Sequence, residues 1–268
     1  MSGFSAEWLA LREPVDAAAR STAVTGFIID ALEAGAGRPS PLRVVDLGCG
    51  TGSNLRYLSP RIRRRQHWRL VDNDPALLSQ AATTAVEIDA RLADLQHLDA
   101  SLLADRHLVT TSALLDLVSD AWLSALVERC AAAGAVVLAV LSYDGRTECT
   151  PADRDDGFVR ELVNLHQRTD KGFGPALGPD SGARAEALLR AAGYDVRRGK
   201  SDWVIPPAHR EMQRQLMAGW ADAALAMGDQ DEGRIRDWTR RRMAAIDSGH
   251  SHIVVGHDDV GAGIGRAH

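Results

Sequence analysis

The chain has 268 residues, of which 45% are hydrophobic, a size and composition that suit one α/β domain with additions or one domain plus a helical cap. A formal net charge of −5 excludes a strong basic field that would recruit nucleic acid, and three scattered cysteines exclude a disulfide framework or a cysteine zinc motif. The N-terminus has no signal-peptide pattern and no apolar run is long enough to span a bilayer, so we expect a cytoplasmic protein.

Predicted helices and strands alternate through the first 145 residues. A helix is expected over 14–34, where apolar residues recur on one stripe. This alternation predicts a doubly wound parallel sheet with helices on both faces. The expected strands cover 42–47, 68–72, 86–92, 107–111 and 135–141, and the helices between them include 54–58, one that starts at Asp74-Pro75, and 120–133.

The second half of the chain has a different pattern. Helices are expected on either side of a glycine-rich loop at 171–180, and strands at 194–204 and 251–255. The first of these helices starts at 150, and a further helical stretch is broken near 228–233. We therefore divide the chain into an N-terminal helical segment, 1–40, and one domain, 41–268. That domain has helical insertions at about 150–192 and 207–247, which we expect to form a cap.

The segment from Val44 onward is the most informative part of the chain. An apolar run ends in an acid, and three glycines at alternate positions separate that acid from the start of a helix. Glycines let the backbone turn sharply and let a ligand approach closely, and the first N–H groups of the helix point at that ligand. The residues of this candidate cofactor site are Asp46, Gly48, Gly50, Gly52 and Asn54.

The spacing of these residues indicates which ligand binds. A dinucleotide fingerprint reads Gly-x-Gly-x-x-Gly, and an acid ahead of the glycines does not suit a pyrophosphate. Asp46 suits a cationic ligand, or one whose amino and hydroxyl groups need an acceptor. The segment resembles motif I of the class I S-adenosylmethionine-dependent methyltransferases. The resemblance implies S-adenosylmethionine as the cofactor and a seven-stranded, mostly parallel sheet whose last strand, 251–257, is inserted antiparallel. A plain tight turn is the alternative.

Further residues follow the predicted strands where such enzymes bind the cofactor. Asp72 ends the second strand, next to Asn73, where a carboxylate accepts both ribose hydroxyls. The resemblance implies that Asp94-Leu95, after the third strand, binds the adenine, and that Thr111 and Ser112, after the fourth, complete the site. The alternatives are helix capping by Asp72 and a solvated loop acid at Asp94.

Four residues are candidates for catalysis, which in methyl transfer consists mainly of positioning the acceptor, sometimes with a general base. Asp116 stands among apolar residues and Tyr143 follows the fifth strand. His166 and Arg168 begin a polar, glycine-rich segment that suits a mobile lid or an anion clamp. The alternatives are capping or ion pairing for Asp116, a turn for Tyr143, and a helix C-terminus with compensating charges for the other two.

A metal site is not expected, although His250, His252 and His257 lie close together in the sequence. Histidines two residues apart share one face of a strand, but no cysteine and no acid at ligand spacing accompany these three.

Three functions remain open. The helical additions and acidic charge favour a methyltransferase for a small-molecule acceptor, either monomeric or as a homodimer. An RNA or protein methyltransferase would need a basic groove, for which the arginine runs at 61–65 and 240–242 are candidates, although such runs are usually solvated. A non-catalytic module would hold the cofactor without transfer. We expect the first, with neither nucleic acid nor a membrane as partner.

Overall fold

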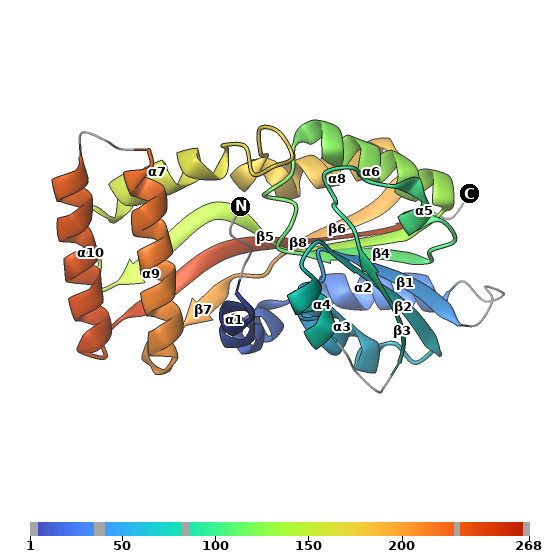
Figure 1. The fold of residues 1–268 in the computed structure, drawn as a ribbon, viewed down its shortest axis with the longest axis horizontal. Helices are drawn as coiled ribbons and strands as arrows, with labels where there is room; N and C mark the ends of the chain where they lie inside the picture. The colour runs from blue at the N-terminus through green and yellow to red at the C-terminus, as the bar shows by residue number, and fades with distance from the viewer. Residues whose placement is uncertain (1–4, 35–40, 82–85, 228–230, 265–268) are drawn as a thin grey trace.

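The computed structural model describes residues 5–34, 41–81, 86–227 and 231–264 (Figure 1). Within these ranges one eight-stranded sheet runs through the molecule, in the order β3–β2–β1–β4–β5–β8–β6, and β7 pairs with β8. The strands are β1 (Leu42–Leu47), β2 (Gln66–Asp72), β3 (Glu87–Leu92), β4 (Leu108–Ser112), β5 (Val136–Thr150), β6 (Tyr194–Lys200), β7 (Trp203–Ile205) and β8 (His252–Ile264).

The sheet confirms the predicted fold class. β1 to β5 are parallel to one another, and β8 runs antiparallel between β5 and β6. The sheet has one strand more than the seven expected. The additional strand is β7, a short strand that pairs with β8. In a parallel sheet of this order the carboxyl ends of β1 and β4 lie side by side, so the residues that follow them form one edge.

Helices cover both faces of the sheet. Figure 1 shows α6 and α8 on one face and α2 and α3 on the other, while α9 and α10 stand together beyond the long strands β5 and β8. The longer helices are α1 (Ala6–Ala19), α2 (Thr22–Glu33), α6 (Asp120–Ala133), α7 (Asp156–Gln167), α8 (Ser181–Ala191), α9 (Arg210–Leu225) and α10 (Glu232–Asp247). The short ones are α3 (Ser53–Leu58), α4 (Pro75–Gln80), α5 (Ala100–Leu103), η1 (Ser59–Arg61), η2 (Gly178–Asp180) and η3 (Pro207–His209).

Two apolar cores form because side chains alternate between the faces of a strand. In β1, Leu42 and Val44 belong to the core that lies under α2 and α3, whereas Val45 and Leu47 belong to the core under α6 and α8. All four side chains are fully buried, as the sequence pattern of a doubly covered strand predicts. No helix in the described ranges is long and apolar enough to cross a membrane.

The single N-terminal helix expected over 14–34 is wrong. Two helices, α1 and α2, are separated by Arg20 and Ser21, and the backbone of Ser21 is extended. The Ser21 N–H donates to the Asp259 carboxylate (2.8 Å) and the Ser21 side chain caps α2, so the chain turns there. Residues 1–4 and 35–40 of the expected N-terminal segment lie outside the described residues.

The boundaries expected around the fifth and last strands are also wrong. β5 continues to Thr150 because residues 147–150 pair with 252–255 of β8, and α7 consequently starts at Asp156 rather than at 150. The predicted strand 194–204 is divided into β6 and β7 at Ser201-Asp202. The extended part of β5 is half exposed and polar, so it lacks the apolar run by which buried strands are recognised.

Candidate cofactor and acceptor sites

The turn after β1 requires glycine at the three predicted positions. Gly48, Gly50 and Gly52 have φ angles of +66°, +53° and +83°, in the left-handed region that other residues rarely adopt. A Cβ atom on Gly50 would lie 3.0 Å from a methyl carbon of Leu9 in α1. The N-terminal helix therefore lies directly over the turn that is predicted to hold the cofactor.

Asp72 organises this turn from the end of β2. Its carboxylate accepts from the Gly50 N–H (2.7 Å) and from the Asp74 N–H (3.0 Å). The capping alternative for Asp72 is wrong, because Asp74 is the residue that caps α4. Each oxygen of a carboxylate has more than one lone pair, so Asp72 retains acceptor capacity for a ligand. Asn73 is exposed beside it.

Asp46 is fully buried at the end of β1 and is only half satisfied. Its Oδ1 atom accepts from Asn54 Nδ2 (3.0 Å), and its Oδ2 atom has no hydrogen-bond partner in the described chain. Burial raises the pKa of Asp46 to about 7. Asn54 also donates to Thr110 Oγ1 (2.9 Å) and accepts from Arg20 Nη1 (2.9 Å). A ligand that brings an N–H or O–H donor fits the free oxygen of Asp46.

The remaining predicted cofactor residues differ in how directly they contact Asn54 and the end of β1. Ser112 lines the same pocket as Asn54. The Thr111 hydroxyl donates to the Leu47 carbonyl (2.8 Å) and so joins β4 to β1. Asp94 is exposed and accepts from the Gln96 N–H (2.9 Å), which also fits the loop-acid alternative. Leu95 is buried, and its carbonyl accepts from the Trp122 indole.

A pocket of about 200 Å³ opens between the N-terminal helices and α3. The sequence did not indicate its N-terminal wall, because α1 has no recognisable motif and was expected to start later. The lining residues are Glu13, Asp16, Ala17, Arg20, Ser53, Asn54, Arg56, Tyr57, Arg61, Ser112 and Leu141.

Asp116 is buried beyond the end of β4, and its carboxylate is only partly satisfied. Its Oδ1 atom has no hydrogen-bond partner in the described chain, and burial raises its pKa to about 6. Ser119, rather than Asp116, caps α6, so the capping alternative is wrong. The Asp116 carbonyl accepts from the Gly178 N–H (3.1 Å), which joins this segment to the loop before α8.

Tyr143 lies within β5 rather than in the turn that was its alternative. The side chain is buried, and its hydroxyl donates to Asn164 Oδ1 of α7 (2.8 Å). Burial raises its pKa above the usual range of a tyrosine. The ring lies 6.2 Å from that of His257, its partner on β8.

His166 and Arg168 make their described contacts within their own loop. Lys171 Nζ donates to the His166 carbonyl (2.8 Å), and burial together with this lysine lowers the pKa of His166. Arg168 pairs with Asp180 (3.0 Å). Phe173 of the same loop packs edge-on against Trp122. The structure thus brings neither residue into a described contact with the side chain of Asp116 or Tyr143.

A buried polar cluster beside Tyr143 joins residues that the sequence does not place together. Trp203 Nε1 donates to Asp16 of α1 (2.8 Å), and Asp16 pairs with Arg12 (2.8 Å). The Trp203 ring lies 4.7 Å from His257. His257 Nδ1 contacts the Val255 carbonyl (3.0 Å), so Nε2 carries the lone pair. Burial first, and then Arg12, lowers the pKa of His257 to about 4.

Among the described residues, no group of three or more His, Cys, Asp or Glu side chains is placed to hold a metal ion. His257 in particular lies among aromatic side chains rather than beside the other two histidines considered in the sequence.

Comparison with known proteins identifies the part of the chain that carries the glycine turn. Residues 44–134 match the model of a family described as a methyltransferase domain. This match confirms the resemblance to class I methyltransferases and S-adenosylmethionine as the cofactor. No curated protein matches the sequence.

Solved structures with a similar backbone have low sequence identity. A cyclopropane synthase from Mycobacterium tuberculosis is 12% identical, over 89% of this chain and 83% of that chain, with a TM-score of 0.46. The human N-acetylserotonin methyltransferase is 17% identical, over 71% of this chain and 48% of that chain (TM-score 0.43). A phosphoethanolamine N-methyltransferase from Haemonchus contortus is 14% identical, over 90% and 53% (TM-score 0.42).

Proposed function

We propose that the methyltransferase domain in this chain transfers the methyl group of S-adenosylmethionine to a small-molecule acceptor. The observation that carries the proposal is that helix α1 covers the glycine turn and carries buried polar side chains of its own. Leu9 lies against the glycine turn, and Arg12 and Asp16 of the same helix are buried beside Trp203. A site closed in this way suits a small acceptor rather than a nucleic acid or a protein surface.

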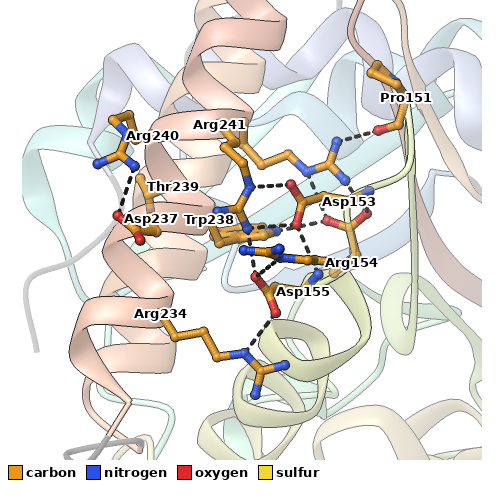
Figure 2. Close-up of polar contacts among 12 residues, drawn as sticks. Pro151, Asp153, Arg154, Asp155, Arg234, Asp237, Trp238, Thr239, Arg240 and Arg241 are labelled. Carbon is orange, nitrogen blue, oxygen red and sulfur yellow. Dashed lines mark hydrogen bonds and ion pairs between the residues drawn. The ribbon is translucent and has the colours of Figure 1, made fainter.

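The arginine run at 240–242 supports a small acceptor, because its charges are already paired. Arg241 forms ion pairs with Asp153 (2.6 Å) and Asp155 (2.7 Å) (Figure 2), and Arg242 pairs with Asp156. The third arginine of this run pairs with Asp237 of its own helix. Phosphate binding requires cations that are available to a ligand, and this run joins α10 to the start of α7 instead.

The cofactor supplies a methyl group on a positively charged sulfonium, so the protein contributes mainly positioning. We propose that Asp46 and Asn54 orient the amino-acid end and that Asp72 orients the ribose. Asp94 and Leu95 would hold the adenine, in the place that the resemblance implies. Ser112 would face the transferring group.

On the acceptor side we propose Asp116 and His257 as the residues that face the acceptor. The carboxylate of Asp116 has a free oxygen, and His257 is neutral at pH 7 because its pKa is low. A neutral imidazole with a free Nε2 atom accepts a proton from a hydroxyl or an amine that attacks the methyl group. We place Tyr143 beside His257, because their rings lie 6.2 Å apart. Because His166 and Arg168 bond within their loop, we assign them to the support of that loop.

The first experiment measures transfer of labelled methyl from S-adenosylmethionine into a cell extract separated into small-molecule, protein and nucleic-acid fractions. We expect label in the small-molecule fraction. Label in either macromolecular fraction would replace the proposal with the protein or RNA alternative. Cofactor binding without label in any fraction would favour a non-catalytic module. Cytoplasmic location and a homodimer stay predictions.

A variant series separates catalysis from cofactor binding. We expect His257→Gln and Asp116→Asn to lower the transfer rate by about 100-fold, which is the usual contribution of a general base, and to leave cofactor affinity unchanged. His252→Gln is the matched control, because His252 is an exposed histidine on the same strand. Equal transfer rates in His257→Gln and His252→Gln would remove His257 from the acceptor site.

A further inference from the structure

Three arginines converge on one short segment of chain at the amino-terminal end of the sheet. The Nε atoms of Arg43 and Arg106 donate to carbonyls of the segment 104–105 (2.7 and 3.0 Å). Arg69 Nη1 donates to the Ser101 carbonyl (3.0 Å) of α5, just before that segment. Because carbonyl oxygens are neutral, these bonds satisfy donors without balancing the positive charges.

Cations outnumber acids around these guanidinium groups. The Asp89 carboxylate pairs with Arg69 (3.0 Å) and also with Arg91 (2.8 Å), so one acid serves two arginines. Within the part of the chain that the structure describes, Arg43 and Arg106 form hydrogen bonds to carbonyls and no ion pair. Each guanidinium has five N–H donors, so most of the donors of these two side chains remain available.

Arg106 is the most enclosed of the three arginines. It is 8% exposed, and its Nη1 atom is buried without a hydrogen-bond partner among the described residues. Burial first, and then the charges of Arg69 and Arg43, lowers the pKa of Arg106, so the three cations act on one another. Asp89 and Asp105 act in the opposite direction, but Asp105 is exposed. A buried donor among like charges is costly unless an anion supplies the missing acceptor.

The three arginines lie apart from the glycine turn. Arg43 is the second residue of β1, and the glycine turn follows the carboxyl end of that strand, roughly 15 Å further along. Arg43 shares a face of β1 with Val45, which pairs with Arg69 of β2. Val45 belongs to the core under α6 and α8. The missing anion is therefore not part of a cofactor held at the glycine turn.

We propose that Arg43, Arg69 and Arg106 form a binding site for a phosphate group, which belongs either to free phosphate or to a small phosphorylated molecule. A phosphate carries close to two negative charges at neutral pH and offers several acceptor oxygens, which match the fork of N–H groups on a guanidinium. A single carboxylate brings only one charge, and a metal cation is repelled. The proposal goes beyond methyl transfer and does not depend on it.

The test titrates inorganic phosphate into the native chain in a Tris chloride buffer and measures binding by calorimetry. We expect saturable binding, which Arg43→Gln and Arg106→Gln each weaken by about 10- to 100-fold, as the loss of hydrogen bonds to a charged group predicts. Arg63→Gln, at an exposed arginine outside the cluster, is the matched control. Equal weakening in Arg63→Gln would overturn the proposal, because the anion would then be attracted only by surface charge.

Thermal melts separate a phosphate site from arginines that only hold the segment 104–105 in place. We expect phosphate to raise the melting temperature of the native chain and to leave that of Arg106→Gln unchanged. Binding of S-adenosylhomocysteine shows that the variant is folded, and the half-buried Arg43→Gln replaces it if it is not. If both variants melt lower than the native chain and phosphate shifts none of the three, the arginines are structural and the proposal is wrong.

Two further probes identify the source of the phosphate group. Tighter binding of glycerol 3-phosphate than of inorganic phosphate would support a small phosphorylated molecule, and the reverse would support free phosphate. A single-stranded oligoribonucleotide is the third probe. If it binds in a manner that Arg106→Gln abolishes, while neither small phosphate binds, an RNA contact replaces the proposed site. Failure of methyl transfer in the extract assay would refute the proposed function and leave all of these outcomes unaffected.

Discussion

Two clusters of arginine and aspartate side chains in this chain differ in how completely their charges are paired. Around α10, Arg241 bonds to Asp153 and Asp155 before α7 (Figure 2), and Arg242 bonds to Asp156. No atom of these residues is among the buried atoms without a partner in the described chain. At the junction of α1 and α2, Arg20 and Asp46 both retain free atoms. We conclude that a satisfied cluster stabilises the fold, whereas an unsatisfied one is built for a ligand.

The largest effect is expected where the paired cluster is broken. Arg242 is 3% exposed and bonds to Asp156 and to the Pro151 carbonyl. Its removal leaves a carboxylate without its cation, so Arg242→Ala should lower the free energy of unfolding by about 3–5 kcal/mol. Urea denaturation measures this loss. Arg240→Ala removes an exposed pair and should cost less than about 1 kcal/mol. Similar losses in the two variants would contradict the structural role.

An intermediate effect is expected from the pH dependence of stability. The pKa of Asp116 is about 6 in the folded chain, above the 3.8 of an ordinary aspartate, so the folded state retains a proton that the unfolded chain releases. Stability contributed by this group therefore falls as pH rises from about 4 to about 6. Between about pH 4 and about pH 6, the free energy of unfolding of Asp116→Asn should therefore rise by up to about 3 kcal/mol relative to that of the native chain. Urea midpoints at both pH values measure it; a pH-independent difference would contradict the assignment.

A smaller effect is expected at the ribose position. Asp72→Ala should reduce S-adenosylmethionine affinity by about 1.5–3 kcal/mol, because it removes a charged acceptor of hydrogen bonds. Calorimetry measures the change. Asp74→Ala, which removes the cap of α4 but not the proposed ribose contact, is the control. Unchanged affinity in Asp72→Ala would refute the ribose assignment.

The smallest effect is expected at Tyr143. Tyr143→Phe removes one hydrogen bond, to Asn164, and should cost about 0.5–1.5 kcal/mol of stability. Because this hydroxyl is already engaged, we expect the transfer rate to fall less than it does in His257→Gln. A larger loss of transfer than in His257→Gln would make Tyr143 the proton acceptor instead.

The glycine turn after β1 and the elements around it were predictable from the sequence because their signals are local. The Asp46 and glycine spacing, the Asp74-Pro75 helix start and the apolar run of β5 are all set by residues adjacent in the chain. The resemblance implied a mostly parallel sheet whose last strand is inserted antiparallel, and the sheet confirms this.

The contacts around the N-terminal helices were not predictable, because they join residues far apart in the sequence. Trp203 bonds to Asp16, and Arg20 reaches Asn54, across separations that no local pattern encodes. The apolar stripe places Arg20 in the interior of one long helix, although the Ser21 N–H bond to Asp259 interrupts that helix. In the sequence His257 suggests only a metal ligand, since its aromatic neighbours come from β5 and β7.

Amide hydrogen exchange with and without S-adenosylmethionine is the sharpest test of the contrast between the two clusters. We expect the cofactor to slow amide exchange at residues 46–54, in α1, and at the junction of α1 and α2 around Arg20. Exchange at residues 234–242 of α10 should stay unchanged. Unchanged exchange at residues 46–54, or equal protection of α10, would contradict the assignment of the unsatisfied cluster to the cofactor.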